Sequence, residues 1–235
     1  MKFQLTPFDA MWAKPFTSAC TAILTAIIIA APLVGSSARA EDPAYFMTIY
    51  GTEPTGPMNP PANAHTWAVF VAAADGDLNS PDLETTVISW DAADGRVFLF
   101  EGLERGRLYD LDETMSLVQA HHAKATRLPV VQIRRKLYDA AVAQYKALNE
   151  GIRSNRAFYT VMDNLQARIN LLKGRHGFTN CIHAVADTGA RAGLTYLQTH
   201  GLRGISASRA VNNYLSAFVI ARNPEWDSIY DSRFP

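Results

Sequence analysis

Two residues of this chain, Cys181 and His65, have the types and the order needed for nucleophilic chemistry. The chain holds two cysteines, and Cys181 lies in Gly177-Phe178-Thr179-Asn180-Cys181-Ile182-His183, directly before an apolar periodic stretch. His65 lies far upstream and opens the alternating apolar stretch 64–71. A thiolate attacks carbonyl carbon, and a neighbouring imidazole can accept the thiol proton and later return it. The pair therefore predicts an acyl-enzyme mechanism with Cys181 as nucleophile and His65 as base.

The residues before Cys181 predict that it lies in the first turn of a helix. Thr179 or Asn180 can cap such a helix, because both types accept a hydrogen bond from its first N–H groups. These N–H groups carry a partial positive charge, which favours a thiolate and can hold an oxyanion. We therefore expect a lowered thiol pKa, an Asn180 cap, and the Cys181 backbone N–H in the oxyanion hole.

A third polar group is needed to orient the imidazole of His65. The strand expected over 84–90 is the natural partner of the His65 strand, and its polar side chains include Glu84, Thr86 and Ser89. The sequence does not fix the register of the two strands. Ser89 is favoured because it lies in an otherwise apolar stretch beside Trp90, and Glu84 is the alternative. A backbone carbonyl or a water molecule could also serve.

Other readings of the same residues compete with this site. His183 is closer in sequence, but two helical positions differ by about 200°, so a structural role is expected for it. Cys181 could also be a small buried apolar residue. A zinc site would combine His176, Cys181 and His183, with His121 or His122 as a further ligand. The spacing lacks a second cysteine and a His-x-x-x-His pair. We therefore expect no metal and no cofactor, and we expect surface or loop positions for His121, His122, His176 and His200.

The first forty residues have the pattern of a secretory signal peptide. Lys2 and Lys14 precede an apolar run over 19–34, and Ser37-Ala38-Arg39-Ala40 follows it. The run is shorter than the roughly twenty residues that span a bilayer, so no stable membrane insertion is expected after cleavage. Cys20 precedes this core and therefore cannot be the lipid-bearing cysteine of a lipoprotein. The prediction is a signal peptide over 1–40, a single domain over 41–235, and a periplasmic or secreted location.

The composition excludes some classes of partner. The chain has 22 Lys+Arg and 22 Asp+Glu, which gives a formal net charge of zero. A nucleic-acid-binding protein is expected to present a basic face. The short run Arg134-Arg135-Lys136 is better explained as the solvated start of a helix, so no nucleic-acid partner is predicted.

The hydrophobic pattern divides the chain into a strand-rich first half and a helical second half. Alternating or β-branched stretches predict strands over 44–50, 65–73, 84–90, 96–101 and 129–133. Three- and four-residue spacing predicts helices over 135–150, 181–194 and from Ser206 or Ser208 to Ala221, with Gly151 ending the first of them. The stretch 157–172 is open between helix and irregular structure, and 102–128 is a polar insertion. The expected class is α+β, a small antiparallel sheet followed by a helical half that carries Cys181 at a helix N-terminus.

These features together resemble the circularly permuted papain-like thiol hydrolases, which include bacterial murein amidase-like and lecithin:retinol acyltransferase-like members. The resemblance covers roughly residues 62–200. It is carried by His65, by Asn180-Cys181, by the strand and helix over 129–150, and by Tyr159. It implies a permuted papain-like fold and a cysteine hydrolase. The polar residue that this group has on its second strand is not evident here unless Glu84 fills that place.

The sequence thus supports two kinds of function. The first is an exported cysteine hydrolase that cleaves an amide or ester, with a cell-wall peptidoglycan peptide or an acyl compound as substrate; an acyltransferase is its close variant. The second is a non-catalytic periplasmic binding or scaffold module on the same fold. In that module Trp67, Trp90 and Trp226 could line a groove, although core packing is their expected role.

Overall fold

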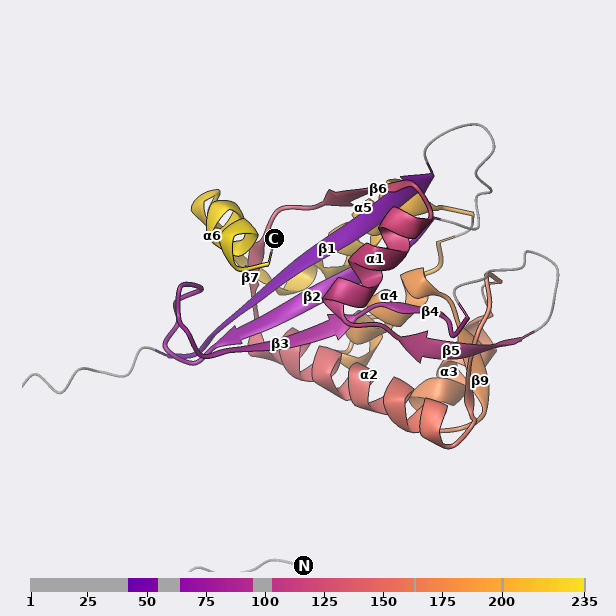
Figure 1. Ribbon diagram of the computed structural model, residues 1–235. Helices are drawn as coiled ribbons and strands as arrows, with labels where there is room; N and C mark the ends of the chain where they lie inside the picture. The colour runs from indigo at the N-terminus through magenta and orange to yellow at the C-terminus, as the bar shows by residue number, and fades with distance from the viewer. Residues whose placement is uncertain (1–41, 55–63, 95–102, 163, 200, 235) are drawn as a thin grey trace, which may run out of the picture. The chain divides into compact units, whose positions relative to one another are not determined.

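The computed structural model describes residues 42–54, 64–94, 103–162, 164–199 and 201–234, which belong to a compact unit spanning Ala40–Pro235. This unit is a mixed α+β structure (Figure 1). Its elements in chain order are β1 (Ala44–Pro54), β2 (Thr66–Ala73), β3 (Leu83–Ile88), β4 (Trp90–Ala92), β5 (Glu104–Leu108), α1 (Leu111–Ala120), β6 (Ala123–Arg127), β7 (Val131–Ile133), α2 (Arg135–Arg153), β8 (Ala157–Tyr159), α3 (Leu165–Leu172), β9 (Gly177–Thr179), α4 (Cys181–Arg191), α5 (Gly204–Leu215), the 3-10 turn η2 (Ser216–Phe218), β10 (Val219–Arg222) and α6 (Glu225–Arg233).

The larger sheet has the strand order β10-β7-β1-β2-β3. The sixth strand, β6, pairs with the C-terminal part of β1, from Tyr50 to Pro54. Nearly every side chain of β2 is buried, because helices cover both faces of the sheet. The core on one face includes Met47, Phe70 and residues of α2, α4 and α5. The core on the other includes Trp67, together with residues of α1 and α6 (Figure 1). β2 is therefore buried on both faces, and His65 precedes its first residue.

The smaller sheet has the order β4-β5-β8-β9, with β8 and β9 parallel. The chain leaves the larger sheet at Ser89, between β3 and β4. Trp90 then ties β4 to β9, because its indole N–H donates to the Thr179 carbonyl at 3.1 Å. Gly106 makes room for this ring, since a Cβ there would lie 1.9 Å from the indole. This sheet therefore fixes Thr179, two residues before Cys181.

Several predicted elements are confirmed. The strands expected over 65–73 and 84–90 pair in antiparallel fashion as β2 and β3. The helix expected over 135–150 is α2, but it continues through Gly151 to Arg153. Gly151 packs against Ala157, where an added Cβ would approach within 2.5 Å. Close packing, and not helix termination, therefore explains this glycine.

The second half contains more strand than the pattern predicts. The stretch 157–172 forms β8 and α3, and β9 precedes the cysteine. The predicted last helix ends at Leu215, and Ala221 lies in β10, which extends the larger sheet. α6 was not predicted. The division into a sheet half and a helical half is therefore wrong.

The polar insertion over 102–128 is also structured. It forms β5, α1 and β6, and α1 begins with a capping box between Asp110 and Glu113. The strand expected over 96–101 and the signal segment over 1–40 lie outside the described residues. Within the described part of the chain, no helix combines the length and apolar character that crossing a bilayer requires.

Candidate active site

Cys181 is the first residue of α4, as the sequence predicts. Asn180 is the N-cap, and its side-chain oxygen accepts the His183 backbone N–H at 2.9 Å. The Cys181 side chain is buried, with 4% of its surface exposed. Three polar groups act on the sulfur, namely the backbone N–H groups of Thr66 and Ile182 and the hydroxyl of Tyr159. The thiol is therefore enclosed, but polar donors reach it.

The thiol is protonated in this structure at neutral pH. Burial raises the pKa of Cys181 to about 12, and the negative charge of Asp91 contributes to the increase. The N–H groups of Thr66 and Ile182 and the Tyr159 hydroxyl lower this pKa, but the desolvation cost of a thiolate is larger. The predicted lowering of the thiol pKa is therefore wrong for the protein in this state.

His65 is held at the entrance to β2 by contacts on both ring nitrogens. Its Nε2 lies 2.9 Å from Ser89 Oγ, and its Nδ1 lies 3.5 Å from Asp91 Oδ2. Nδ1 is buried and makes no hydrogen bond within the described residues. The ring also stacks on Trp67, with centroids 5.5 Å apart. Burial lowers the pKa of His65, although Asp91 opposes the shift.

The predicted ion pair between His65 and Cys181 is not present. Among the described residues, no hydrogen bond joins the imidazole to the sulfur, since Nε2 is directed to Ser89 and Nδ1 makes no hydrogen bond but lies nearest Asp91. The two groups meet through shared neighbours. Thr66, the next residue after His65, lies at the sulfur, and Asp91 acts on both Cys181 and His65. The structure therefore places both predicted residues near Asp91, but without a hydrogen bond between them.

Ser89 lies where the sequence placed the third group, whereas Glu84 does not. Glu84 pairs with Ala72 at the far end of the β2–β3 ladder. His65 precedes the near end, so the Glu84 alternative is wrong.

Asp91 is the site residue that the sequence analysis missed. The segment from Asp91 to Gly95 has the composition of a turn, but Asp91 lies within β4. The β2–β3 ladder pairs Ala68 with Ile88. Continued by three residues in each direction, this register places His65 opposite Asp91. If the apolar faces of both strands had been used to predict their register, Asp91 would have been predicted to lie opposite His65.

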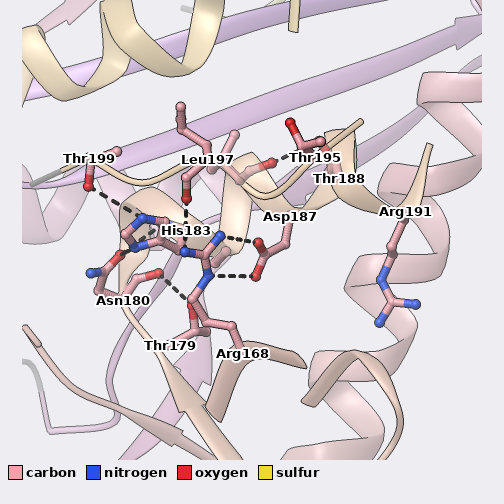
Figure 2. Close-up of polar contacts among 12 residues, drawn as sticks. Arg168, Thr179, Asn180, His183, Asp187, Thr188, Arg191, Thr195, Leu197 and Thr199 are labelled. Atoms are coloured by element: carbon pink, nitrogen blue, oxygen red, sulfur yellow. Dashed lines mark hydrogen bonds and ion pairs between the residues drawn. The ribbon is translucent and has the colours of Figure 1, made fainter. Parts of the chain in front are cut away.

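The polar groups behind Cys181 have a different arrangement (Figure 2). His183 is fully buried, and its ring nitrogens lie 2.9 Å from Asn180 Oδ1 and 3.3 Å from Thr199 Oγ1. Asp187, one turn further along α4, forms an ion pair with Arg168 of α3, and 3% and 1% of these side chains are exposed. These contacts give His183 the structural position that its helical spacing predicts.

None of the remaining candidates contacts Cys181 in the described part of the chain, although His121 is close enough to His65 to help lower the pKa of that imidazole. The His176 ring packs on Phe158 at 4.8 Å, and His121 and His122 follow the end of α1. His200 lies outside the described residues. No group of three or more His, Cys, Asp and Glu residues in the described ranges could hold a metal ion.

The tryptophans have the packing roles that were expected. Trp67 and Trp90 are fully buried, and Trp226 packs edge-on against Phe46. No tryptophan among the described residues therefore lines an open groove beside Cys181.

Comparisons of the chain with protein-family models, with curated proteins and with solved structures gave no match.

Proposed function

We propose that this protein is a cysteine hydrolase with a circularly permuted papain-like fold. Cys181 attacks the carbonyl carbon of an amide or ester, and His65 transfers the protons. The proposed substrate is a peptide of the cell wall, in keeping with the export signal that the first forty residues predict. No metal or cofactor takes part in this scheme.

The observation that carries the proposal is the unbonded Nδ1 of His65. A buried ring nitrogen normally has a hydrogen-bond partner. This one makes no hydrogen bond and faces Asp91. The residue after His65, Thr66, places its backbone N–H at the Cys181 sulfur. For Nδ1 to act as a base, the ring proton must be on Nε2. Nε2 then donates to Ser89 Oγ, which gives Ser89 the orienting role.

The chemistry follows from these positions. Nδ1 takes the thiol proton, and the Asp91 carboxylate, 3.5 Å away, stabilises the imidazolium. The sulfur forms a bond to the carbonyl carbon, and the oxygen becomes an oxyanion. As this intermediate collapses, the carbon–nitrogen or carbon–oxygen bond breaks and Nδ1–H protonates the leaving group. Water, deprotonated by the same nitrogen, then cleaves the thioester and restores the free thiol.

The groups around the sulfur suit the oxyanion. The Ile182 N–H belongs to the free N-terminus of α4, and the Tyr159 hydroxyl reaches the same sulfur from β8. Donors already aimed at developing charge lower the barrier without further reorganisation. Tyr159 therefore joins the Cys181 N–H as an oxyanion donor in this scheme.

A test of the proposal is trapping of the acyl-enzyme. The purified protein is incubated with a p-nitrophenyl ester and with peptidoglycan, and the mass of the intact protein and the released products are followed. The wild type should form an acyl adduct on Cys181 and turn over substrate. Cys181→Ala should do neither. Equal turnover by wild type and Cys181→Ala would rule out the proposed nucleophile.

The alternative is a non-catalytic binding module, and the high pKa of the Cys181 thiol favours it. A thiol with a pKa of about 12 is almost entirely protonated near neutral pH and therefore a poor nucleophile. If neither substrate acylates Cys181 at any pH between about 6 and 9, the module replaces the hydrolase.

A further inference from the structure

A pocket lies at the opposite end of the β2–β3 ladder from His65. It has a volume of about 560 Å³. One rung of the sheet forms its floor, where Tyr45, Ala72 and Glu84 are neighbours on β1, β2 and β3. Ala72 is small and leaves space between its two larger neighbours. With about 3.3 Å per strand residue, this rung is roughly 23 Å from His65, so the pocket is separate from the candidate active site.

The charge of this pocket is unbalanced. Its lining includes the acidic residues Asp82, Glu84 and Asp139 and a single base, Arg135. Arg135 already pairs with Asp139 at 3.4 Å along α2. Neither Asp82 nor Glu84 forms an ion pair within the described ranges, and both are exposed at the pocket. Two carboxylates are thus left without a cation.

Tyr138 of α2 supplies an independent sign of a ligand. Only 5% of its surface is exposed, and it lines the pocket. Its hydroxyl makes no hydrogen bond of normal geometry within the described chain, although the side chains of Glu84 and Thr86 are close enough to interact with it. A buried hydroxyl without a partner is costly, and a donor placed in the pocket would satisfy it.

Aromatic rings form the apolar part of the same pocket. The Tyr138 ring packs against Tyr45 with centroids 5.0 Å apart. Val142, one turn after Tyr138, extends this wall. A short carbon chain therefore has a surface to cover between the rings and the floor at Ala72.

We propose that this pocket binds a primary ammonium group on a short aliphatic stem. The ammonium donates to the carboxylates of Asp82 and Glu84 and to the hydroxyl oxygen of Tyr138. Its methylene groups lie along Tyr45 and Ala72, and the faces of the two rings favour the positive charge. The excess of carboxylates disfavours anions, and a neutral alcohol forgoes the charge-assisted hydrogen bonds.

The test is a calorimetric titration of the purified protein with cadaverine, and with 1-pentanol as the neutral comparison. Wild type and the control Asp112→Asn, which removes an exposed carboxylate on α1, should bind cadaverine equally. Glu84→Gln should weaken binding by roughly tenfold or more, because a charged hydrogen bond is lost. Tyr138→Phe should weaken it several-fold without lowering the melting temperature, since it removes an unpartnered hydroxyl.

Three results would overturn the proposal. They are the absence of saturable cadaverine binding, equal binding of 1-pentanol, and unchanged affinity in Glu84→Gln. The last two would indicate that the space holds only water or takes up apolar molecules without regard to charge. These results are independent of catalysis, because no variant in the test touches Cys181 or His65.

Discussion

The two sides of the α4 N-terminus differ in how their buried polar groups are paired. On the α3 side, His183 is bonded to Asn180 and Thr199, and Asp187 to Arg168 (Figure 2). On the β2 side, His65 keeps a buried Nδ1 without a hydrogen bond. Buried polar groups with complete pairing hold a structure together, whereas an unpaired group in a cluster of titratable residues marks a place for a proton or a ligand. The comparison assigns stability to one side of the helix and chemistry to the other.

Exchange of the two histidines for glutamine tests this assignment most strongly. His65→Gln removes the proposed base and should lower kcat/KM on an acyl ester by about 10²–10⁴-fold. His183→Gln should leave kcat/KM within a few-fold of wild type but lower the free energy of unfolding by about 1–2 kcal/mol, because its buried hydrogen bonds are disturbed. Ester kinetics and urea unfolding measure the two effects. Equal loss of activity in both variants would remove the distinction between the two sides.

Loss of the buried ion pair should give the largest change in stability. Arg168→Met removes the guanidinium that pairs with the buried Asp187 carboxylate and frees the Leu197 carbonyl, which Arg168 contacts at 3.0 Å. Removal of one member of such a pair costs about 3–5 kcal/mol. The double variant Arg168→Met with Asp187→Leu should be more stable than the single variant, since the buried carboxylate is removed together with the guanidinium that pairs with it. A single variant that unfolds at the wild-type urea concentration would contradict this account.

The helices and strands differ in how clearly their sequences predict them, and the difference has a physical reason. The β2 and α2 segments were found because burial on one or both faces leaves a clear apolar period. The segment 102–128 was missed because β5, α1 and β6 are short and expose many polar side chains. β8 and β9, of three residues each, depend on tertiary pairing with β5 and with each other, and no local period can reveal such strands.

The site shows the same limit. The Asn180 cap and the Ser89 contact with His65 follow from local pattern, and both are seen. The thiol pKa was expected to fall because a helix N-terminus favours the anion, a contribution of about 1 kcal/mol in usual cases. Burial acts in the opposite direction and is larger. The depth at which α4 packs against the sheet is a tertiary property that the motif around Cys181 does not contain.

The smallest expected effect is on the dependence of stability on pH. The pKa of His65 is lowered by burial, so below about pH 6.5 the unfolded chain binds a proton that the folded protein does not, and stability falls as the pH falls. The pKa of Cys181 is raised from 9.0 to about 12, so above about pH 9 the unfolded chain loses a proton that the folded protein keeps, and stability falls as the pH rises. Each group contributes a slope of at most about 1.4 kcal/mol per pH unit.

Urea unfolding at closely spaced pH values separates the two contributions. His65→Gln should flatten the profile between pH 5 and 6.5. Cys181→Ala should make it less steep than wild type between pH 9 and 10, where the buried tyrosines contribute to the slope of both proteins. If His65→Gln leaves the acid slope unchanged, His65 is not the buried neutral base that the β2 side of the helix requires, and the contrast with the α3 side loses its chemical meaning.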